Sequence, residues 1–179
     1  MRRSHALLLS LALVVMSARP SNAQDVGHVG VTMAFPAAVG VIWQATDRLA
    51  IRPDFQFSQS AVGSLSSSQI STAVGVSALF YVRKWDNLRA YLSPRFGYQH
   101  QSVTTTGSLA NPTSLDQYSY AGSFGAEYQL HRRFAVFGEV GLMYNHTVTD
   151  NPSSFSGGSV STTGHIWGTR AGVGAIVYF

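Results

Sequence analysis

The chain has 179 residues, which allows one domain and leaves little room for a second. Charged residues make up only 11% of it, well below the roughly 25% usual in soluble domains, and its many aromatic residues exclude a disordered chain. The formal net charge of +4 includes Arg2, Arg3 and Arg19, which lie in a segment that we expect to be removed. No basic stripe remains without them, so nucleic-acid binding has no electrostatic support. The chain has no Cys, which rules out a disulfide framework.

Residues 1–23 have the pattern of a cleaved signal peptide. Arg2 and Arg3 form its positive start, residues 6–16 are its apolar run, and Ser-Asn-Ala at 21–23 offers a cleavage site between small residues. The apolar run is too short for a membrane-spanning helix, which needs about 20 residues. We therefore predict an exported mature chain, residues 24–179, that forms a single domain. In a membrane, such a chain must cross as a closed barrel, because only helices and barrels satisfy the backbone in lipid.

The mature chain alternates between apolar residues and small or polar ones, which is the period of a β-strand. Val29, Val31, Met33 and Phe35 share one face in this way. No stretch shows a sustained helical period. In chain order, the alternation predicts eight strands, at residues 26–35, 38–45, 49–58, 70–82, 89–102, 117–130, 133–147 and 162–179.

The predicted connections alternate in length. Short, charged connections at 46–48, 83–88 and 131–132 alternate with long ones rich in Ser, Thr, Gly and Asn at 59–69, 103–116 and 148–161; the first, at 36–37, is a short exception. Outer-membrane barrels likewise have short periplasmic turns and longer outer loops. The sequence therefore predicts an all-β fold, a membrane-spanning antiparallel up-and-down β-barrel of about eight strands in the outer membrane of a Gram-negative-type bacterium.

Residue parity assigns one face of each strand to lipid and the other to the lumen. The lumen face collects three positive and three negative residues: Arg52, Asp54, Arg95, Glu127, Glu139 and Arg170. The opposite assignment would place all six in hydrocarbon, where an Arg at the midplane costs about 2–4 kcal/mol. An eight-stranded interior is just wide enough to be filled by side chains. We therefore expect a self-neutralising charged plug, with aromatic girdles at both ends of the outer face.

The last eight residues resemble the terminal signal that the barrel-assembly machinery reads. Phe179, Val177 and Gly174 match its final aromatic residue, the hydrophobe two positions before it and the Gly five before it, whereas Gly172 departs from the polar residue expected there. The mature chain resembles the outer-membrane protein β-barrel domain family, similar to the eight-stranded transmembrane part of outer-membrane protein A. This resemblance implies a fold, a location among outer-membrane lipid and lipopolysaccharide, and insertion by the assembly machinery, but little about activity.

His100 and Ser102 share a face near the outer end of one strand. They resemble the His-x-Ser pair of lipid A deacylase barrels, in which a His base activates the Ser, and Asp116 is a candidate for the accompanying carboxylate. Polar residues at an interfacial strand end are the alternative explanation, and spacing alone does not define a triad. We therefore assign no catalytic residue.

The other features of the sequence predict neither a metal site nor a cofactor. His28, His146 and His165 are scattered and lack the spacing of helical metal ligands. The Gly-rich stretches lie in strands and open no helix, so a phosphate-binding loop is unsupported.

The leading hypothesis is a non-enzymatic barrel with a plugged lumen and a structural or surface-interaction role, in which the outer loops 59–69, 103–116 and 148–161 meet an extracellular ligand. Rigid scaffolds commonly carry their binding residues on such loops. A lipid A deacylase-like interfacial hydrolase and a narrow solute channel are the alternatives.

Overall fold

The computed structural model describes residues 27–35, 38–62, 67–105, 113–152 and 159–179. The predicted signal peptide and the connection at 36–37 lie outside the described residues. The described part of the chain contains no helix that could span a membrane. Its strands are β1 (Val29–Phe35), β2 (Ala38–Thr46), β3 (Leu49–Val62), β4 (Ser67–Trp85), β5 (Leu88–Thr105), β6 (Thr113–His131), β7 (Phe134–Pro152) and β8 (Ser159–Tyr178).

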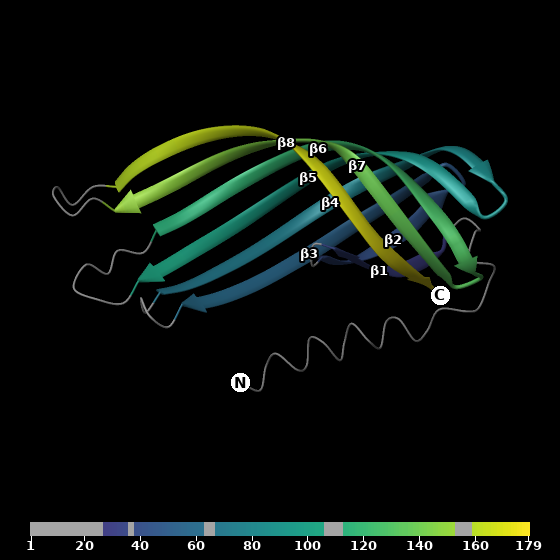
Figure 1. The fold of residues 1–179 in the computed structure, drawn as a ribbon, viewed down its shortest axis with the longest axis horizontal. Helices are drawn as coiled ribbons and strands as arrows, with labels where there is room; N and C mark the ends of the chain where they lie inside the picture. The colour runs from purple at the N-terminus through teal and green to yellow at the C-terminus, as the bar shows by residue number, and fades with distance from the viewer. Residues whose placement is uncertain (1–26, 36–37, 63–66, 106–112, 153–158) are drawn as a thin grey trace.

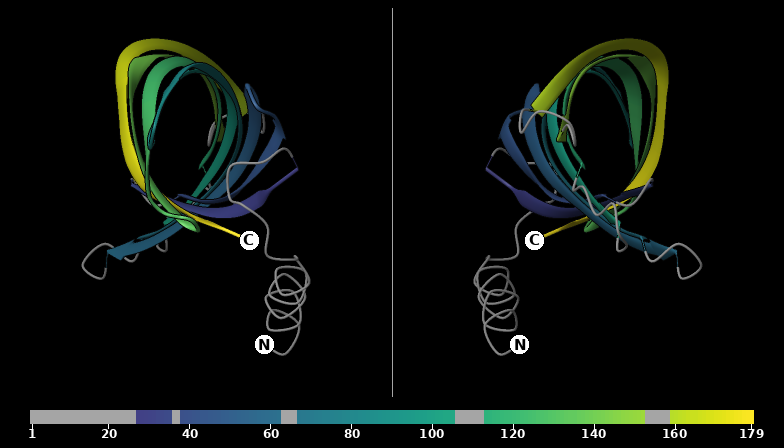
Figure 2. Two further views of the ribbon diagram at one scale, coloured as in Figure 1. Left: turned by 90° about the vertical axis from the view of Figure 1, so that its right-hand side faces the viewer. Right: turned by 90° about the vertical axis from the view of Figure 1, so that its left-hand side faces the viewer.

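The eight strands form a closed antiparallel barrel. Each strand pairs with the next one in the sequence, and β1 also pairs with β8, which closes the sheet. Figure 1 shows the strands running side by side in chain order, and the end-on views of Figure 2 show them around a common interior. The predicted up-and-down barrel is therefore confirmed.

The three connections predicted to be short are two-residue turns. Residues 47–48, 86–87 and 132–133 link consecutive strands. Asp86 has a φ of 22°, and positive φ angles are typical of tight hairpin turns, which follow the twist of the strands. Beside two of the turns, side-chain amides cap a backbone carbonyl: Gln44 Nε2 donates to the Thr46 carbonyl at 3.1 Å, and Gln129 Nε2 donates to that of His131 at 2.6 Å.

The three connections predicted to be long are shorter than expected. β3 runs to Val62 and β4 starts at Ser67, β5 runs to Thr105 and β6 starts at Thr113, and β7 runs to Pro152 and β8 starts at Ser159. More than half of the residues of 59–69, 103–116 and 148–161, taken together, therefore lie in paired strands. Their paired residues are mostly Ser, Thr, Gln and Asn and show no regular apolar alternation, yet their backbones continue the ladder of antiparallel hydrogen bonds.

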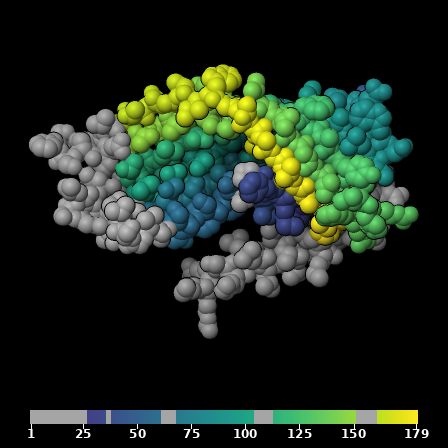
Figure 3. Space-filling model, in the orientation of Figure 1, coloured from purple at the N-terminus to yellow at the C-terminus, as the bar shows by residue number. Residues whose placement is uncertain are grey.

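The wall of the barrel is uneven at the loop end because β1 and β2 are short. β2 pairs with β3 as far as Val39 opposite Phe55, and β1 pairs with β8 as far as Phe35 opposite Val173. Beyond these points, residues 56–62 of β3 pair only with β4, and residues 159–172 of β8 pair only with β7, among the described residues. Figure 3 shows the surface hollowed between β8 and the blue strands of the N-terminal half.

The two faces of the strands have the predicted character. Large apolar residues are exposed on the outer face of every strand, among them Met33, Trp43, Val76, Phe96, Phe124, Leu142 and Val173. At the turn end the lumen holds an apolar cluster that includes Ile42, Leu79 and Ile176, together with the rings of Tyr81, Tyr91 and Tyr178. A closed sheet with an apolar outside and a polar, side-chain-filled inside is the architecture of a membrane-spanning barrel.

Candidate functional site

The lumen holds three groups of charged side chains, stacked along the barrel. The lowest group surrounds Glu127, whose side chain is 1% exposed. Arg89 donates to Glu127 Oε1, which also accepts from the Tyr178 hydroxyl at 2.9 Å. Tyr81 donates to Oε2 at 2.9 Å. One carboxylate from β6 is thus held by side chains from β4, β5 and β8.

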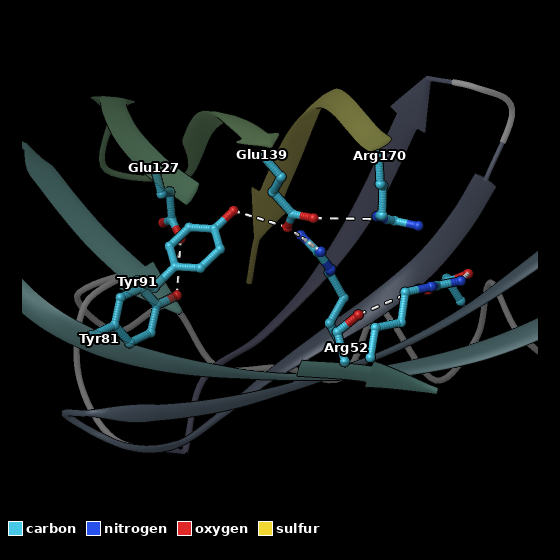
Figure 4. Close-up of polar contacts among 9 residues, drawn as sticks. Arg52, Tyr81, Tyr91, Glu127, Glu139 and Arg170 are labelled. Atoms are coloured by element: carbon cyan, nitrogen blue, oxygen red, sulfur yellow. Dashed lines mark hydrogen bonds and ion pairs between the residues drawn. The ribbon is translucent and has the colours of Figure 1, made fainter. Parts of the chain in front are cut away.

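The middle group is centred on Glu139 of β7 (Figure 4). Its Oε1 accepts from Arg52 Nη2 and, at 3.0 Å, from the Tyr91 hydroxyl. Its Oε2 lies 3.7 Å from Arg170 Nη2 of β8, within ion-pair distance but too far for a hydrogen bond. Arg52 also lies over the Phe137 ring, with Cζ 4.6 Å from the centroid.

The upper group pairs Arg95 of β5 with Asp54 of β3. The two terminal nitrogens of the guanidinium donate to the two carboxylate oxygens, with Nη2 2.6 Å from Oδ1. This is the fork geometry that Arg offers a carboxylate. A Cβ at Gly75 would lie 2.1 Å from Arg95 Nη2, so the glycine leaves the space that the guanidinium occupies.

The six lumen charges chosen from the sequence thus lie inside the barrel, but they are not the complete set. Arg89 is also buried in the lumen and takes Glu127 as its partner. Among the described residues, the lumen therefore holds four positive and three negative side chains instead of three of each, and the expectation of a self-neutralising plug is wrong. The signal that could have found Arg89 was its parity, which it shares with Ser93 and Arg95 on β5.

The same parity rule could have found the buried tyrosines. Tyr91 lies in line with Arg95 on β5, and Tyr178 lies in line with Gly174 on β8, so both face inward. The expected aromatic girdles account only for aromatic residues on the outer face. Tyr91 fits because a Cβ at Gly125 would lie 2.5 Å from its ring, so the small residue on the neighbouring strand leaves room for the large one.

A cavity of about 290 Å³ lies in the lumen around the upper two groups. Its charged lining consists of Arg52, Asp54, Arg95, Glu139 and Arg170. Phe35 at the end of β1 and Ala38 at the start of β2 also line it, so the cavity lies where the wall of the barrel is lowest.

The His100 group lies on the outer face, at the loop end of β5. Asp116 sits directly opposite His100 in the ladder between β5 and β6, and Asp116 Oδ1 lies 2.8 Å from His100 Nδ1 and 2.6 Å from the Tyr98 hydroxyl. The hydrogen bond from Tyr98, followed by that from His100, lowers the pKa of Asp116 below its ordinary value. The structure therefore brings together two of the three residues considered from the sequence. No hydrogen bond joins Ser102 to His100 in the described part of the chain.

Two of the histidines that are scattered in the sequence are neighbours in space. His146 and His165 face each other across β7 and β8, with their Nδ1 atoms 3.2 Å apart, and the Tyr144 hydroxyl lies 2.7 Å from Nδ1 of His165. Among the described residues, no group of three or more His, Cys, Asp or Glu side chains could hold a metal ion.

The residues of the predicted assembly signal lie at the end of the last strand. A Cβ at Gly174 would lie 2.5 Å from the Phe137 ring, so this glycine also has a packing role. The backbone N–H of Phe179 donates to the Val29 carbonyl at 3.0 Å, close to where β8 closes the barrel against β1. Recognition of Gly174, Val177 and Phe179 by the assembly machinery stays a prediction.

Comparisons with known proteins support the fold. The structure matches that of a major outer membrane protein from Thermus thermophilus, with a TM-score of 0.57 and 13% identity over 85% of this chain and 98% of that one. The chain has the fold of an outer-membrane β-barrel. CarO from Acinetobacter baumannii is less similar, with a TM-score of 0.41 and 12% identity over 89% of this chain and 100% of that one. Ail, the attachment invasion locus protein of Yersinia pestis, has a TM-score of 0.46 and 11% identity over 85% of this chain and 94% of that one.

No protein-family model and no curated protein sequence matches this outer-membrane barrel. A specific likeness to outer-membrane protein A therefore stays an expectation. The closed sheet, the apolar outer face and the fold shared with an outer membrane protein agree on an outer-membrane location.

Proposed function

We propose that this protein is a non-enzymatic surface-interaction barrel, plugged by its lumen side chains, that binds an extended polypeptide at its outer end. The observation that carries the proposal is that the sheet extends beyond the band of apolar residues on its outer face. A tilted strand crosses a membrane with about 9–11 residues, whereas β6 and β7 have 19 residues each and β8 has 20. On the outer face of β6, the apolar residues end at Tyr118 and the next outward position is Asp116, so the remainder projects from the membrane.

The projecting part of β8 is open on both faces. Ile166 and Trp167 are consecutive and point to opposite faces, yet they are 62% and 74% exposed. Within the membrane-spanning part, by contrast, Ile176 is fully buried in the lumen. The upper end of β8 therefore belongs to a free sheet rather than to a filled barrel.

In the part of the chain that the structure describes, two edges of this sheet have no strand beside them, at residues 56–62 of β3 and 159–172 of β8. Natural edge strands are usually protected by charged residues, Pro or bulges, because unpaired N–H and C=O groups attract other strands. Apart from Arg170, which lines the lumen cavity, residues 56–62 and 159–172 contain no Asp, Glu, Lys, Arg or Pro. Unprotected edges of this length support binding by strand addition, in which the partner's backbone supplies the hydrogen bonds.

Site-specific photo-crosslinking on living cells tests the proposal. A photoreactive residue at Ser58 or Ser161, on the two edges, should give adducts with a partner, whereas one at Asp47 in a turn at the opposite end should not. Proline removes a backbone donor, and N–H groups of alternate residues point to the outer side of an edge strand. One of Thr162→Pro and Thr163→Pro should therefore abolish the adduct, whereas Thr163→Val should preserve it.

Heat-dependent mobility on gels checks that each variant is folded. Folded variants that give no adduct at either edge, or adducts that both prolines leave unchanged, would contradict strand addition. The same proposal includes outer-membrane lipid and lipopolysaccharide, which surround the barrel, and the assembly machinery, which inserts it.

A second candidate function is hydrolysis at the lipid interface, which the hydrogen bond between His100 and Asp116 favours. Such a bond orients an imidazole and fixes its tautomer, as a catalytic base requires. Mass spectrometry of lipid A from cells that express the wild type, Ser102→Ala or His100→Ala tests it. Loss of an acyl chain with the wild type alone would support hydrolysis, and identical lipid A in all three strains would reject it.

A further inference from the structure

The upper lumen carries an unbalanced positive charge. Arg89 and Glu127 neutralise each other lower in the barrel. The remaining charges of the lumen are those that line the cavity, namely Arg52, Arg95 and Arg170 against Asp54 and Glu139. Three guanidinium groups thus face two carboxylates inside a membrane-embedded barrel, where an uncompensated charge is costly.

Arg170 is the group left without a full partner. Asp54 is engaged by both terminal nitrogens of Arg95, and Glu139 Oε1 is engaged by Arg52. Arg170 approaches Glu139 Oε2 only to 3.7 Å and makes no hydrogen bond among the described residues. Its side chain is 27% exposed, so it is substantially withdrawn from water.

Two guanidinium nitrogens are buried here without an acceptor. Nε of Arg170 and Nη1 of Arg52 have no hydrogen-bond partner in the described part of the chain. Both residues line the 290 Å³ cavity, together with the hydroxyl-bearing residues Thr32 and Thr169. The cavity thus combines a net positive charge, guanidinium groups with unfilled hydrogen-bonding capacity on its lining residues, and a volume at the lower end of ligand-binding pockets.

We infer that the upper lumen is a binding site for a small oxyanion, a carboxylate or a phosphate, held by Arg170 and Arg52. Planar guanidinium groups bind such oxygens through paired, charge-assisted hydrogen bonds. One bound anion supplies the missing negative charge and accepts from the guanidinium groups of Arg170 and Arg52 that line the cavity. The inference concerns the lumen and does not depend on a partner at the sheet edges.

Equilibrium dialysis of the folded protein in detergent micelles against radiolabelled inorganic phosphate, with acetate as competitor, tests the site. We expect saturable binding of one phosphate per chain. Arg170→Gln removes both the excess charge and a donor, and losing a hydrogen bond to a charged group weakens binding by about tenfold or more. Arg133→Gln, in the turn at the opposite end, makes the same change in net charge and should bind phosphate as the wild type does.

Two further variants keep the test decisive if Arg170→Gln does not fold. Arg170→Lys keeps the charge and should retain part of the binding. Asp54→Asn makes the cavity more positive and should bind phosphate more tightly. The inference is overturned if the wild type binds no phosphate, if Arg170→Gln binds as well as Arg133→Gln, or if Asp54→Asn binds no more tightly than the wild type. Displacement by acetate identifies a general oxyanion site, whereas its failure assigns the site to phosphate.

Discussion

Replacing Glu127 with Gln should lower the free energy of unfolding sharply. The side chains of Glu127 and Arg89 are 1% and 6% exposed, so both charges are withdrawn from water. The same carboxylate accepts hydrogen bonds from Tyr81 and Tyr178. The substitution changes little in size but leaves the Arg89 guanidinium buried with no charge to oppose it.

The expected loss is about 3–5 kcal/mol, the usual cost of removing one partner of a buried ion pair. The Gln carbonyl oxygen can still accept from one of the tyrosines, which favours the lower end of this range. A loss of this size is a large part of the roughly 5–15 kcal/mol that stabilises a typical domain.

Urea unfolding of the barrel in lipid vesicles, followed by Trp fluorescence and by gel mobility, measures this loss. Asp47→Asn, which neutralises an exposed carboxylate in a turn, is the matched control and should change the free energy of unfolding by no more than about 0.5 kcal/mol. The double variant Arg89→Gln with Glu127→Gln removes both charges. It should be more stable than the sum of the two single losses predicts, by about 1 kcal/mol or more.

Two results would refute this reasoning. The first is a loss for Glu127→Gln no larger than that for Asp47→Asn, which would mean that water reaches the lower lumen. The second is a double variant whose loss equals the sum of the single losses, which would mean that Arg89 and Glu127 do not interact.

Three further predictions concern the upper lumen, the plug and the outer face. Gly75→Ala should displace Arg95 from its partner and destabilise the barrel by about 1–3 kcal/mol, the usual cost of overpacking, in the same urea assay. In planar bilayers the wild type should show no sustained current, and a steady open-pore conductance would contradict a plugged lumen. Tyr98→Phe should raise the pKa of Asp116 toward its ordinary value, as measured by NMR titration of the carboxyl carbon. The pKa of Asp116 is lower in the folded protein than in the unfolded one, so its carboxylate stabilises the fold fully above the unfolded pKa. This stabilisation is lost as the pH falls through the folded pKa. In Tyr98→Phe the loss should therefore begin at a higher pH.

The membrane-spanning part of the fold could be predicted from parity alone. Lipid and lumen differ so much as solvents that alternate positions must differ in residue type, and Phe124 beside Gly125 on β6 illustrates the rule. The turns could be predicted as well, because clusters such as Asp86-Asn87 interrupt the alternation. Both features depend on local sequence, which a single chain displays directly.

The partners within the lumen could not be predicted in the same way. Parity places Arg52 and Glu139 inside the barrel, but their contact depends on the register and shear of strands that are far apart in the sequence. Arg89 was overlooked because it directly follows a turn, where a charged residue has an ordinary explanation as a solvated side chain. Its burial depends on how far along the barrel axis β5 begins, and the alternation of residue types does not indicate this position.

The predicted strands are too short mainly at the loop end, although β4 also runs three residues further than predicted at the turn end, to Trp85. In lipid, a strand must alternate, because one face meets hydrocarbon. Above the membrane both faces of the sheet meet water, so Ser, Thr and Asn can occupy either face, and stretches such as 148–161 look like loops in the sequence. The backbone nevertheless continues to pair, because Thr favours strands and nothing interrupts the ladder before Pro152. Where the membrane no longer constrains side-chain choice, residues such as Ile166 and Trp167 can be exposed on both faces, and this freedom is what a recognition surface requires.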